Sequence, residues 1–317
     1  MTVRIGILGA GAIGCFVGAM WAAGGAQVTL VGRARIVDAL NTHGLRLTGG
    51  DEIRLSPGQF TATTDPGALA RCDLIVVAVK GPALAAALDD LPDAIPVLTL
   101  MNGISPPGIV AERFPGRTVL AGMVPFNVIS PAPGHWHRAS GGTVAVQDHP
   151  LTRNLPAVRT LGDMEPVLWG KLLLNLNNAI NALSGLSLQD ELSIRGYRRV
   201  LAAAQREALA LLAGAGIVPA RGTALPPSLV PAFLETPDWF FRPIGLRLQK
   251  IDASARSSMA DDIAAGRTTE IDWLNGEVVR LAESLGRTAP INRTIADMIR
   301  QIELAPRRYS ANELRLA

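Results

Sequence analysis

A short apolar segment that leads directly into a glycine-rich turn constrains the fold of this chain more than any other feature. Residues 3–8 are typical of a buried strand, and an apolar, helix-like segment follows the turn Gly9-Ala10-Gly11-Ala12-Ile13-Gly14. In a turn of this pattern the first glycine permits the sharp change of direction, the second lets a pyrophosphate approach the backbone, and the third lets helix and strand pack closely. The anion binds the free N–H groups at the helix start. With a second strand at residues 27–31, the segment predicts a Rossmann-type dinucleotide-binding domain in which the six turn residues contact the cofactor.

The residues after the second predicted strand indicate which dinucleotide is bound. An NAD site places an acidic residue there to accept a hydrogen bond from the ribose 2′-hydroxyl, whereas this chain has Gly32-Arg33-Ala34-Arg35. A small residue leaves room for a 2′-phosphate, and guanidinium groups bind phosphate through paired hydrogen bonds. We therefore expect NADP(H) as the cofactor. The alternative is that Arg33 and Arg35 only belong to the solvated start of a helix.

Length and composition predict a compact soluble protein of two domains. The chain has 317 residues, of which 48% are hydrophobic and 18% are charged. Its apolar tracts are too short for a transmembrane helix, and the first of them is too short for a secretion signal. The net charge of +3 suits an anionic ligand but is too small to indicate binding to nucleic acid.

The cysteines and histidines indicate neither disulfide bonds nor a metal site. Cys15 and Cys72 are the only cysteines, which fits a reducing cytoplasm, and both are expected to be small buried side chains. The four histidines form no HExxH motif and no cluster with cysteine. His135 and His137 share one face of a predicted strand, but the glycine-containing turns on either side favour a hairpin over a zinc site.

The strand and helix patterns divide the chain near Pro166. Before this residue, continuous apolar runs at residues 74–79, 97–101 and 119–124 are typical of a parallel sheet covered on both faces. Short strands within residues 125–146 predict an antiparallel extension at the far edge of that sheet. Helices are expected at residues 168–183, 194–215, 269–285 and 292–303. The expected fold is an α/β Rossmann-type domain at residues 1–166 and an all-helical domain at residues 167–317, which can also form a homodimer face.

Two polar residues follow buried strands of the first predicted domain. Lys80 comes after the run at residues 74–79, and Asn102 comes after the run at residues 97–101. Because parallel strands end at the same edge of a sheet, both are expected at the edge where a dinucleotide lies. Asn102 can then bind the nicotinamide ribose or the substrate, and Lys80 the cofactor or an acidic substrate. The alternative is that both are ordinary polar loop residues without a functional role.

The helix predicted at residues 168–183 carries a polar stripe on an otherwise apolar surface. Successive helical residues turn by about 100°, so Lys171, Asn175 and Asn178 fall on one stripe about 60° wide. Buried polar groups need partners, so this stripe predicts either a ligand site or a network of asparagines that ties the helix to the first domain.

A third group of polar residues comprises Ser257-Ser258-Met259 and Thr269-Glu270-Ile271-Asp272. Glu270 has an ordinary interpretation, because Thr268 or Thr269 can cap a helix whose first turn holds an acidic residue. This segment taken alone does not predict a site.

Taken together, these regions resemble the ketopantoate reductases, the NADPH-dependent 2-dehydropantoate 2-reductases of pantothenate synthesis. The resemblance covers nearly the whole chain. It rests on the glycine turn, Lys80, Asn102-Gly103, Trp169-Gly170-Lys171 with Asn175, and Ser257-Ser258-Met259 leading to Thr269-Glu270-Ile271-Asp272 with Asn275-Gly276. The fold that it implies agrees with the two predicted domains.

The resemblance implies a reduction of ketopantoate to pantoate in which NADPH supplies a hydride and Lys171 protonates the developing alkoxide. It also implies that Glu270 holds Lys171 in place beside substrate and cofactor, that Asn175 and Ser258 bind the keto acid, that Asn102 and Lys80 lie on the nucleotide side, and that Arg33 binds the 2′-phosphate.

One departure from the family pattern leaves the substrate open. The family places a second asparagine eight residues after the lysine, followed by Pro-Leu, but this chain has Ala179 at that position. Asn178 and Asn181 are alternative replacements, and a further asparagine expected after the helix is not recognisable. A reductase of another 2-keto acid therefore remains an alternative, and a non-catalytic NADP-sensing protein is a second one.

Overall fold

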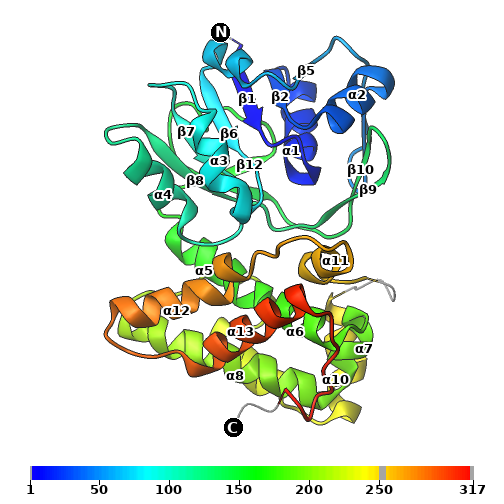
Figure 1. Ribbon diagram of the computed structural model, residues 1–317, viewed down its shortest axis with the longest axis vertical. Helices are drawn as coiled ribbons and strands as arrows, with labels where there is room; N and C mark the ends of the chain where they lie inside the picture. Colours follow the sequence, from blue (N-terminus) through cyan, green and yellow to red (C-terminus); the bar gives the residue numbers. More distant parts are fainter. Residues whose placement is uncertain (1, 250–254, 315–317) are drawn as a thin grey trace. The chain divides into compact units, whose positions relative to one another are not determined.

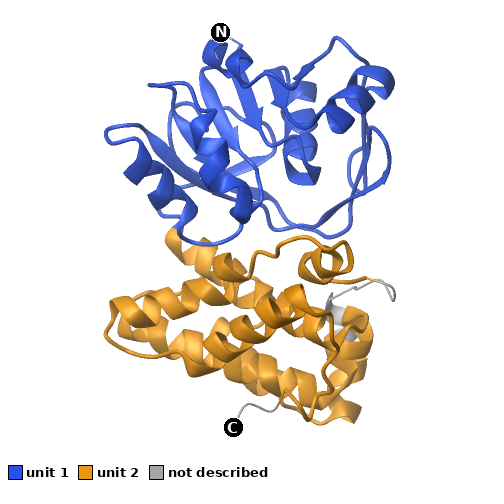
Figure 2. Ribbon diagram, viewed as in Figure 1, with its two compact units in different colours: residues 1–164 blue, residues 165–317 orange. Residues whose placement is uncertain are grey.

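The computed structural model describes residues 2–249 and 255–314, and the chain divides into two compact units, Met1–Met164 and Glu165–Ala317 (Figure 2). All strands of the described residues belong to unit 1, and unit 2 is helical. This arrangement confirms the predicted fold class. None of the helices that the structure describes is both long and apolar enough to cross a membrane.

The main sheet of unit 1 has eight strands. They are β1 (Arg4–Leu8), β2 (Gln27–Val31), β5 (Thr61–Thr63), β6 (Leu74–Val77), β7 (Val97–Thr99), β8 (Val119–Met123), β11 (Val144–Gln147) and β12 (Val158–Leu161). Their spatial order is β12-β11-β8-β7-β6-β1-β2-β5, and the six strands from β5 to β8 are all parallel. Numbered along the chain, these six follow the order 3-2-1-4-5-6, which is the order of dinucleotide-binding sheets.

Alternate residues of the central strands enter two separate cores, which explains the continuous apolar runs. Ile5 and Ile7 pack in a core shared with α1 (Ala12–Ala23), whereas Leu8 packs in a core on the other face. That second core also contains Leu84 of α3 (Leu84–Asp89) and Val110 of α4 (Pro106–Arg113). Figure 1 shows helices on both sides of this sheet. A parallel sheet covered in this way requires apolar side chains on both faces of each strand.

A second, four-stranded sheet corrects one prediction. Its order is β4 (Ile53–Leu55), β3 (Leu45–Thr48), β10 (His135–Arg138) and β9 (Val128–Ala132). The hairpin within residues 125–146 therefore does not extend the edge of the main sheet, because β10 pairs in parallel with β3. Only β11 forms the expected antiparallel extension, against β8. The pairing of β10 with β3 joins segments about ninety residues apart, so no local sequence pattern predicts it.

The remaining short elements of unit 1 are α2 (Ala34–His43) and the 3-10 helices η1 (Pro66–Arg71) and η2 (Gly81–Ala83). Unit 2 consists of α5 (Glu165–Asn175), α6 (Asn177–Ser184), α7 (Leu188–Ser193), α8 (Arg195–Gly214), α9 (Val230–Leu234), α10 (Asp238–Gln249), α11 (Ser258–Ala264), α12 (Asn275–Ser284) and α13 (Pro290–Leu304), with the 3-10 helices η3 (Pro227–Leu229) and η4 (Ile271–Trp273). Two predicted helices are interrupted. The first divides at Leu176, and the one expected from residue 269 begins as η4 and becomes α-helical only at Asn275.

Candidate active site

The glycine turn lies where the strand order of the main sheet reverses. It follows β1, whose two neighbours in the sheet are β2 and β6, and ligands of open α/β sheets bind at this position. Gly9 has a φ of +108°, and a Cβ atom there would lie 2.7 Å from the carbonyl oxygen of Ala78. The backbone N–H of Gly9 donates to the carbonyl oxygen of Val31 at 3.0 Å. Gly9 is therefore required both by its conformation and by the closeness of β6.

The other two glycines of the turn have different surroundings. A Cβ atom on Gly14 would overlap the carbonyl oxygen of Gly9, whereas a Cβ atom on Gly11 would meet no atom within 4 Å. Gly11 is exposed and precedes α1 without giving a side-chain cap, and no acidic residue lies in the first turn of α1. The positive end of this helix is thus open to an anion. The surroundings of the three glycines suit the predicted turn, and their roles toward a pyrophosphate stay a prediction.

The predicted 2′-phosphate contacts lie beside this turn. A Cβ atom on Gly32 would lie 2.5 Å from the Cβ atom of Ala10, so only glycine lets the segment after β2 pass this close to the turn. Arg33 is the residue before α2, and both Arg33 and Arg35 are exposed. Across residues 2–249 and 255–314, neither guanidinium has a hydrogen-bond or ion-pair partner. Both are thus available to an added phosphate.

Lys80 and Asn102 lie at the same sheet edge as the glycine turn. Lys80 follows β6 and is exposed, whereas Asn102 follows β7 and is half-buried. Because β1, β6 and β7 are parallel neighbours, the segments after them emerge at one edge. Their placement relative to the sheet agrees with the prediction, and their roles toward a ligand stay a prediction.

In unit 2, Lys171 and Glu270 interact electrostatically although they are far apart in sequence. Lys171 lies on α5 and is only partly exposed. Burial lowers the pKa of the Lys171 ammonium group to about 8, and the carboxylate of Glu270 opposes this by raising it. The pair therefore contains a lysine that is charged at neutral pH and able to release a proton near it.

The structure contradicts the interpretation of Glu270 as a helix cap. Glu270 is 8% exposed and precedes η4, but its side chain makes no capping hydrogen bond. The hydroxyl oxygen of Thr269 instead accepts a hydrogen bond from the backbone N–H of Ile271 at 3.3 Å. The carboxylate is thus directed to other partners, among them Lys171.

The asparagines after Lys171 fall into two groups. Asn175 on α5 and Asn178 on α6 are half-buried, whereas Asn177 and Asn181 are buried. The amide nitrogen of Asn181 donates to the carbonyl oxygen of Leu186 at 3.1 Å, and its amide oxygen accepts from the backbone N–H of Ser257 at 2.9 Å. Both ends of the Asn181 amide are therefore used inside unit 2. Which of Asn178 and Asn181 replaces the family's second asparagine stays a prediction.

Ser257 fixes the start of α11. Its hydroxyl donates to the carbonyl oxygen of Asn178 at 3.0 Å and accepts from the backbone N–H of Ala260 at 3.1 Å. Ser258 is the first residue of α11 and is exposed. Sequence reasoning missed the structural role of Ser257, although a serine three residues before the N–H that it caps is a recognisable helix-start signal. The role predicted for Ser258 toward a keto acid stays a prediction.

The histidines and cysteines lie outside these regions. Thr48 lies between the two histidines of β10, with its hydroxyl oxygen 2.8 Å from Nε2 of His135 and 2.9 Å from Nδ1 of His137. In the part of the chain that the structure describes, no group of three or more His, Cys, Asp and Glu residues is placed to hold a metal ion. Cys15 and Cys72 are buried free thiols, as predicted, and burial raises the pKa of each.

The chain matches family models and curated relatives along almost its full length. Residues 5–150 match the model described as ketopantoate reductase PanE/ApbA, and residues 163–303 match that of its C-terminal part. A 2-dehydropantoate 2-reductase of Halobacterium salinarum is 30% identical over 94% of this chain and 98% of its own. A 2-dehydropantoate 2-reductase of Pyrococcus horikoshii is 27% identical over 92% of this chain and 94% of its own.

Solved structures show the same fold. A PanE/ApbA family ketopantoate reductase from Ralstonia eutropha has a TM-score of 0.80 at 26% identity and covers 96% of this chain and 99% of its own. D-mandelate dehydrogenase in complex with NADH and anilino(oxo)acetate has a TM-score of 0.78 at 21% identity, with the same two coverages, and shows likeness of fold alone. The match of both family models, together with full-length relatives, establishes that this chain is an oxidoreductase that belongs to the ketopantoate reductase family.

Proposed function

We propose that this protein reduces 2-dehydropantoate (ketopantoate) to pantoate with NADPH, a step of pantothenate and coenzyme A synthesis. The observation that carries the proposal is the interaction of Lys171 with Glu270, because it gives this family member a positioned proton donor. A non-catalytic NADP sensor would not need such a pair. The free cysteines, Cys15 and Cys72, support a cytoplasmic location.

The proposed cofactor site consists of the glycine turn and the residues after β2. The start of α1 and the exposed Gly11 would receive the pyrophosphate. Arg33, assisted by Arg35, would bind the 2′-phosphate, because both are exposed without a partner among the described residues and no carboxylate takes their place. These residues favour NADPH over NADH. Lys80 and Asn102 would serve the nucleotide at the same sheet edge, and Asn102 is the alternative contact for the substrate.

Bound NADPH would supply the hydride that adds to the keto carbon. Lys171 would donate a proton to the oxygen that becomes the hydroxyl, and its positive charge would stabilise the alkoxide as it forms. Its pKa of about 8 keeps most of the lysine protonated at neutral pH while making proton release easier than from an exposed lysine. Glu270 would hold the ammonium group in place and accept a hydrogen bond from a substrate hydroxyl.

The substrate contacts are proposed on three polar residues of unit 2 that are not fully buried. Asn175 and Asn178 are half-buried, and Ser258 is exposed at the start of α11. We assign the carboxylate of the keto acid to Ser258 and its other oxygen atoms to the two asparagines. Asn181 is not included, since its amide is already bonded at both ends.

A second candidate function is the reduction of another 2-keto acid by the same chemistry. The specific observation in its favour is Ala179, which is fully buried where the family pattern has an asparagine. Loss of one hydrogen-bonding group from a substrate site is enough to change substrate preference strongly.

The test is the loss of NADPH absorbance with a panel of 2-keto acids, repeated with NADH. Ketopantoate should give the highest kcat/KM of the panel, and NADPH should exceed NADH. A higher kcat/KM with another keto acid would select the second candidate, and an absence of turnover with every member would reject both.

A further inference from the structure

A buried carboxyl group lies behind the segment that carries Ser258. Glu191 on α7 is fully buried, and its Oε2 atom accepts hydrogen bonds from the side-chain amides of Asn177 at 3.1 Å and Asn181 at 3.4 Å. Its second oxygen, Oε1, has no hydrogen-bond partner among the described residues. A carboxyl group in such a place either pairs with a cation or carries a proton.

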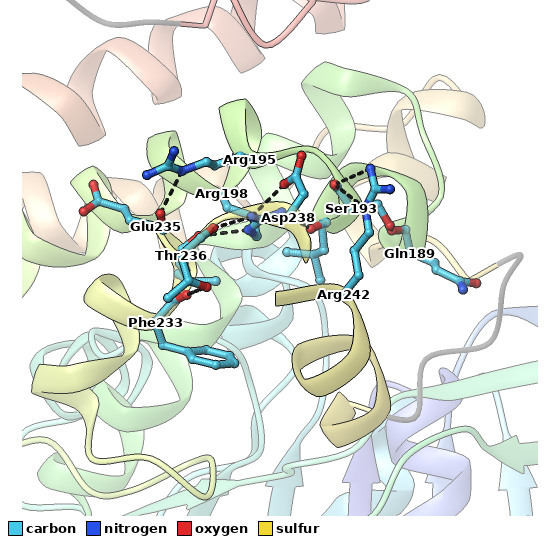
Figure 3. A network of polar contacts seen from close by, with 11 residues as sticks. Gln189, Ser193, Arg195, Arg198, Phe233, Glu235, Thr236, Asp238 and Arg242 are labelled. Atoms are coloured by element: carbon cyan, nitrogen blue, oxygen red, sulfur yellow. Dashed lines mark hydrogen bonds and ion pairs between the residues drawn. The ribbon is translucent and has the colours of Figure 1, made fainter. Parts of the chain in front are cut away.

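Three described arginines beside α7 do not supply that cation. The buried guanidinium of Arg198 donates to the carbonyl oxygens of residues 192, 234 and 236 and to the carboxylate of Asp238 (Figure 3). Arg195 donates to the carbonyl oxygen of Glu235, and Arg242 donates to that of Ser193 (Figure 3). These three arginines come from α8 and α10, the helices packed most closely on α7. None of them bonds to Glu191.

The other titratable groups that the structure describes around α7 do not pair with Glu191 either. Helix α6 contains no ionisable side chain, and Asp190 on α7 itself is exposed and accepts from the hydroxyl of Ser187. On α8, the hydroxyl of Tyr197 donates to the carbonyl oxygen of Tyr309, and the charge of Glu191 is one cause that raises the pKa of Tyr197. Arg256, on the segment that pairs with the start of α7, is exposed.

Burial therefore dominates the state of this carboxyl group. It raises the pKa of Glu191 to about 8, and the two asparagine amides oppose the shift only in part. Glu191 is thus mostly protonated at neutral pH, which removes the cost of a buried, unpaired charge.

The neutral carboxyl group is connected to the substrate segment through Asn181. Glu191 and the carbonyl oxygen of Leu186 both accept from the amide nitrogen of Asn181, so the amide oxygen faces the backbone N–H of Ser257. The hydroxyl of Ser257 in turn caps α11, whose first residue is Ser258.

We propose that protonated Glu191 is a positioning residue for keto-acid binding: with Asn177 and Asn181 it fixes Ser257 and thereby places Ser258 for the substrate carboxylate. The proposal rests on the proposed function in assigning Ser258 to the keto acid. Ionisation of Glu191 would put an unpaired charge among these groups and disturb the start of α11.

The first experiment requires no substrate and tests the protonation. Infrared difference spectra between wild type and Glu191→Gln at pH 7 should contain the C=O band of a protonated carboxylic acid, and this band should disappear as the pH is raised through about 8. Asp190→Asn, an exposed carboxylate on the same helix, is the control and should show no such band. A wild type without the band would overturn the proposal.

The second experiment tests the positioning through the keto-acid KM. At pH 7, Glu191→Gln should keep the KM within about twofold, because glutamine copies the neutral acid, whereas Asn181→Leu should raise it about tenfold, as expected for loss of one hydrogen bond. The dissociation constant of NADPH should change in neither variant. An unchanged keto-acid KM in folded Asn181→Leu would overturn the positioning role.

If Asn181→Leu does not fold, the keto-acid KM of wild type and of Glu191→Gln at different pH values tests the proposal instead. The ratio of the keto-acid KM of wild type to that of Glu191→Gln should be about 1 at pH 7 and rise severalfold by pH 9, since only wild type ionises at this position. Titration of Lys171 affects both proteins and cancels in the ratio. A constant ratio would overturn the proposal. If the panel of 2-keto acids shows a substrate other than ketopantoate, the same ratio is measured with that acid. The proposed substrate and the positioning role of Glu191 can therefore fail separately.

Discussion

The carboxylate of Glu270 raises the pKa of the Lys171 ammonium group while burial lowers it, and the balance places that pKa at about 8. A general acid works best when its pKa lies near the working pH. The two side chains come from segments about one hundred residues apart, so the chemistry of Lys171 depends on how unit 2 folds.

This balance predicts the pH dependence of the reduction. The acid form of Lys171 is present below its pKa, so kcat/KM for the keto acid should fall as the pH rises above about 8. Glu270→Gln removes the charge that raises this pKa, so the fall should move to lower pH. The measurement is the pH profile of kcat/KM for wild type and variant, and a shift to higher pH in Glu270→Gln would contradict the assignment.

Lys171→Ala tests the proton donor itself. Loss of a positioned general acid costs about 10²- to 10⁴-fold, so kcat should fall by that factor while NADPH binding, followed by fluorescence, stays intact. If the variant instead unfolds far below the wild-type temperature with its kcat retained, Lys171 is a structural residue.

Arg33→Ala tests the choice of cofactor. A charged hydrogen bond to phosphate contributes about 1.5–3 kcal/mol, so the KM for NADPH should rise about tenfold or more and the KM for NADH should hardly change. Arg71→Ala, an exposed arginine of the same unit, serves as the control. Equal use of NADPH and NADH by wild type would exclude the proposed role of Arg33.

Two glycines of the turn should respond differently to alanine. In Gly14→Ala the new methyl group overlaps the carbonyl oxygen of Gly9, so we expect loss of stability by about 1–3 kcal/mol together with loss of NADPH binding. In Gly11→Ala the methyl group enters open space, so thermal unfolding should stay close to wild type while NADPH binding weakens, because the pyrophosphate approaches there. Equal destabilisation of both variants would contradict this division of roles.

The buried acid on α7 predicts how stability depends on pH. In the unfolded chain Glu191 titrates near 4.5, and in the folded protein near 8, so the folded state holds the extra proton between these values. The contribution of Glu191 to the free energy of unfolding is therefore fully present below about pH 4.5. It is lost as the pH rises toward 8, by up to roughly 1.4 kcal/mol per pH unit. Denaturant unfolding of wild type and Glu191→Gln at pH 5 and pH 8 checks this. The stability of wild type relative to the variant should fall with pH, and a rise would refute a neutral Glu191.

The sequence by itself determined those features that depend on neighbours along the chain. The steric demands of Gly9 and Gly14, the absence of a carboxylate at Arg33 and the apolar runs of the strands are local, so they predict the dinucleotide turn, the cofactor preference and the parallel sheet. The resemblance to the family added the roles that are proposed for Lys171 and Glu270.

Only the tertiary structure decided the features that depend on contacts between distant segments. It pairs β10 with β3 and excludes the capping role of Glu270. It also uses both ends of the Asn181 amide and buries Glu191. The physical reason is that pairing, hydrogen-bond satisfaction and the pKa of a buried group are set by whatever surrounds a side chain in space, and in each of these cases the decisive partner lies in another segment of the chain.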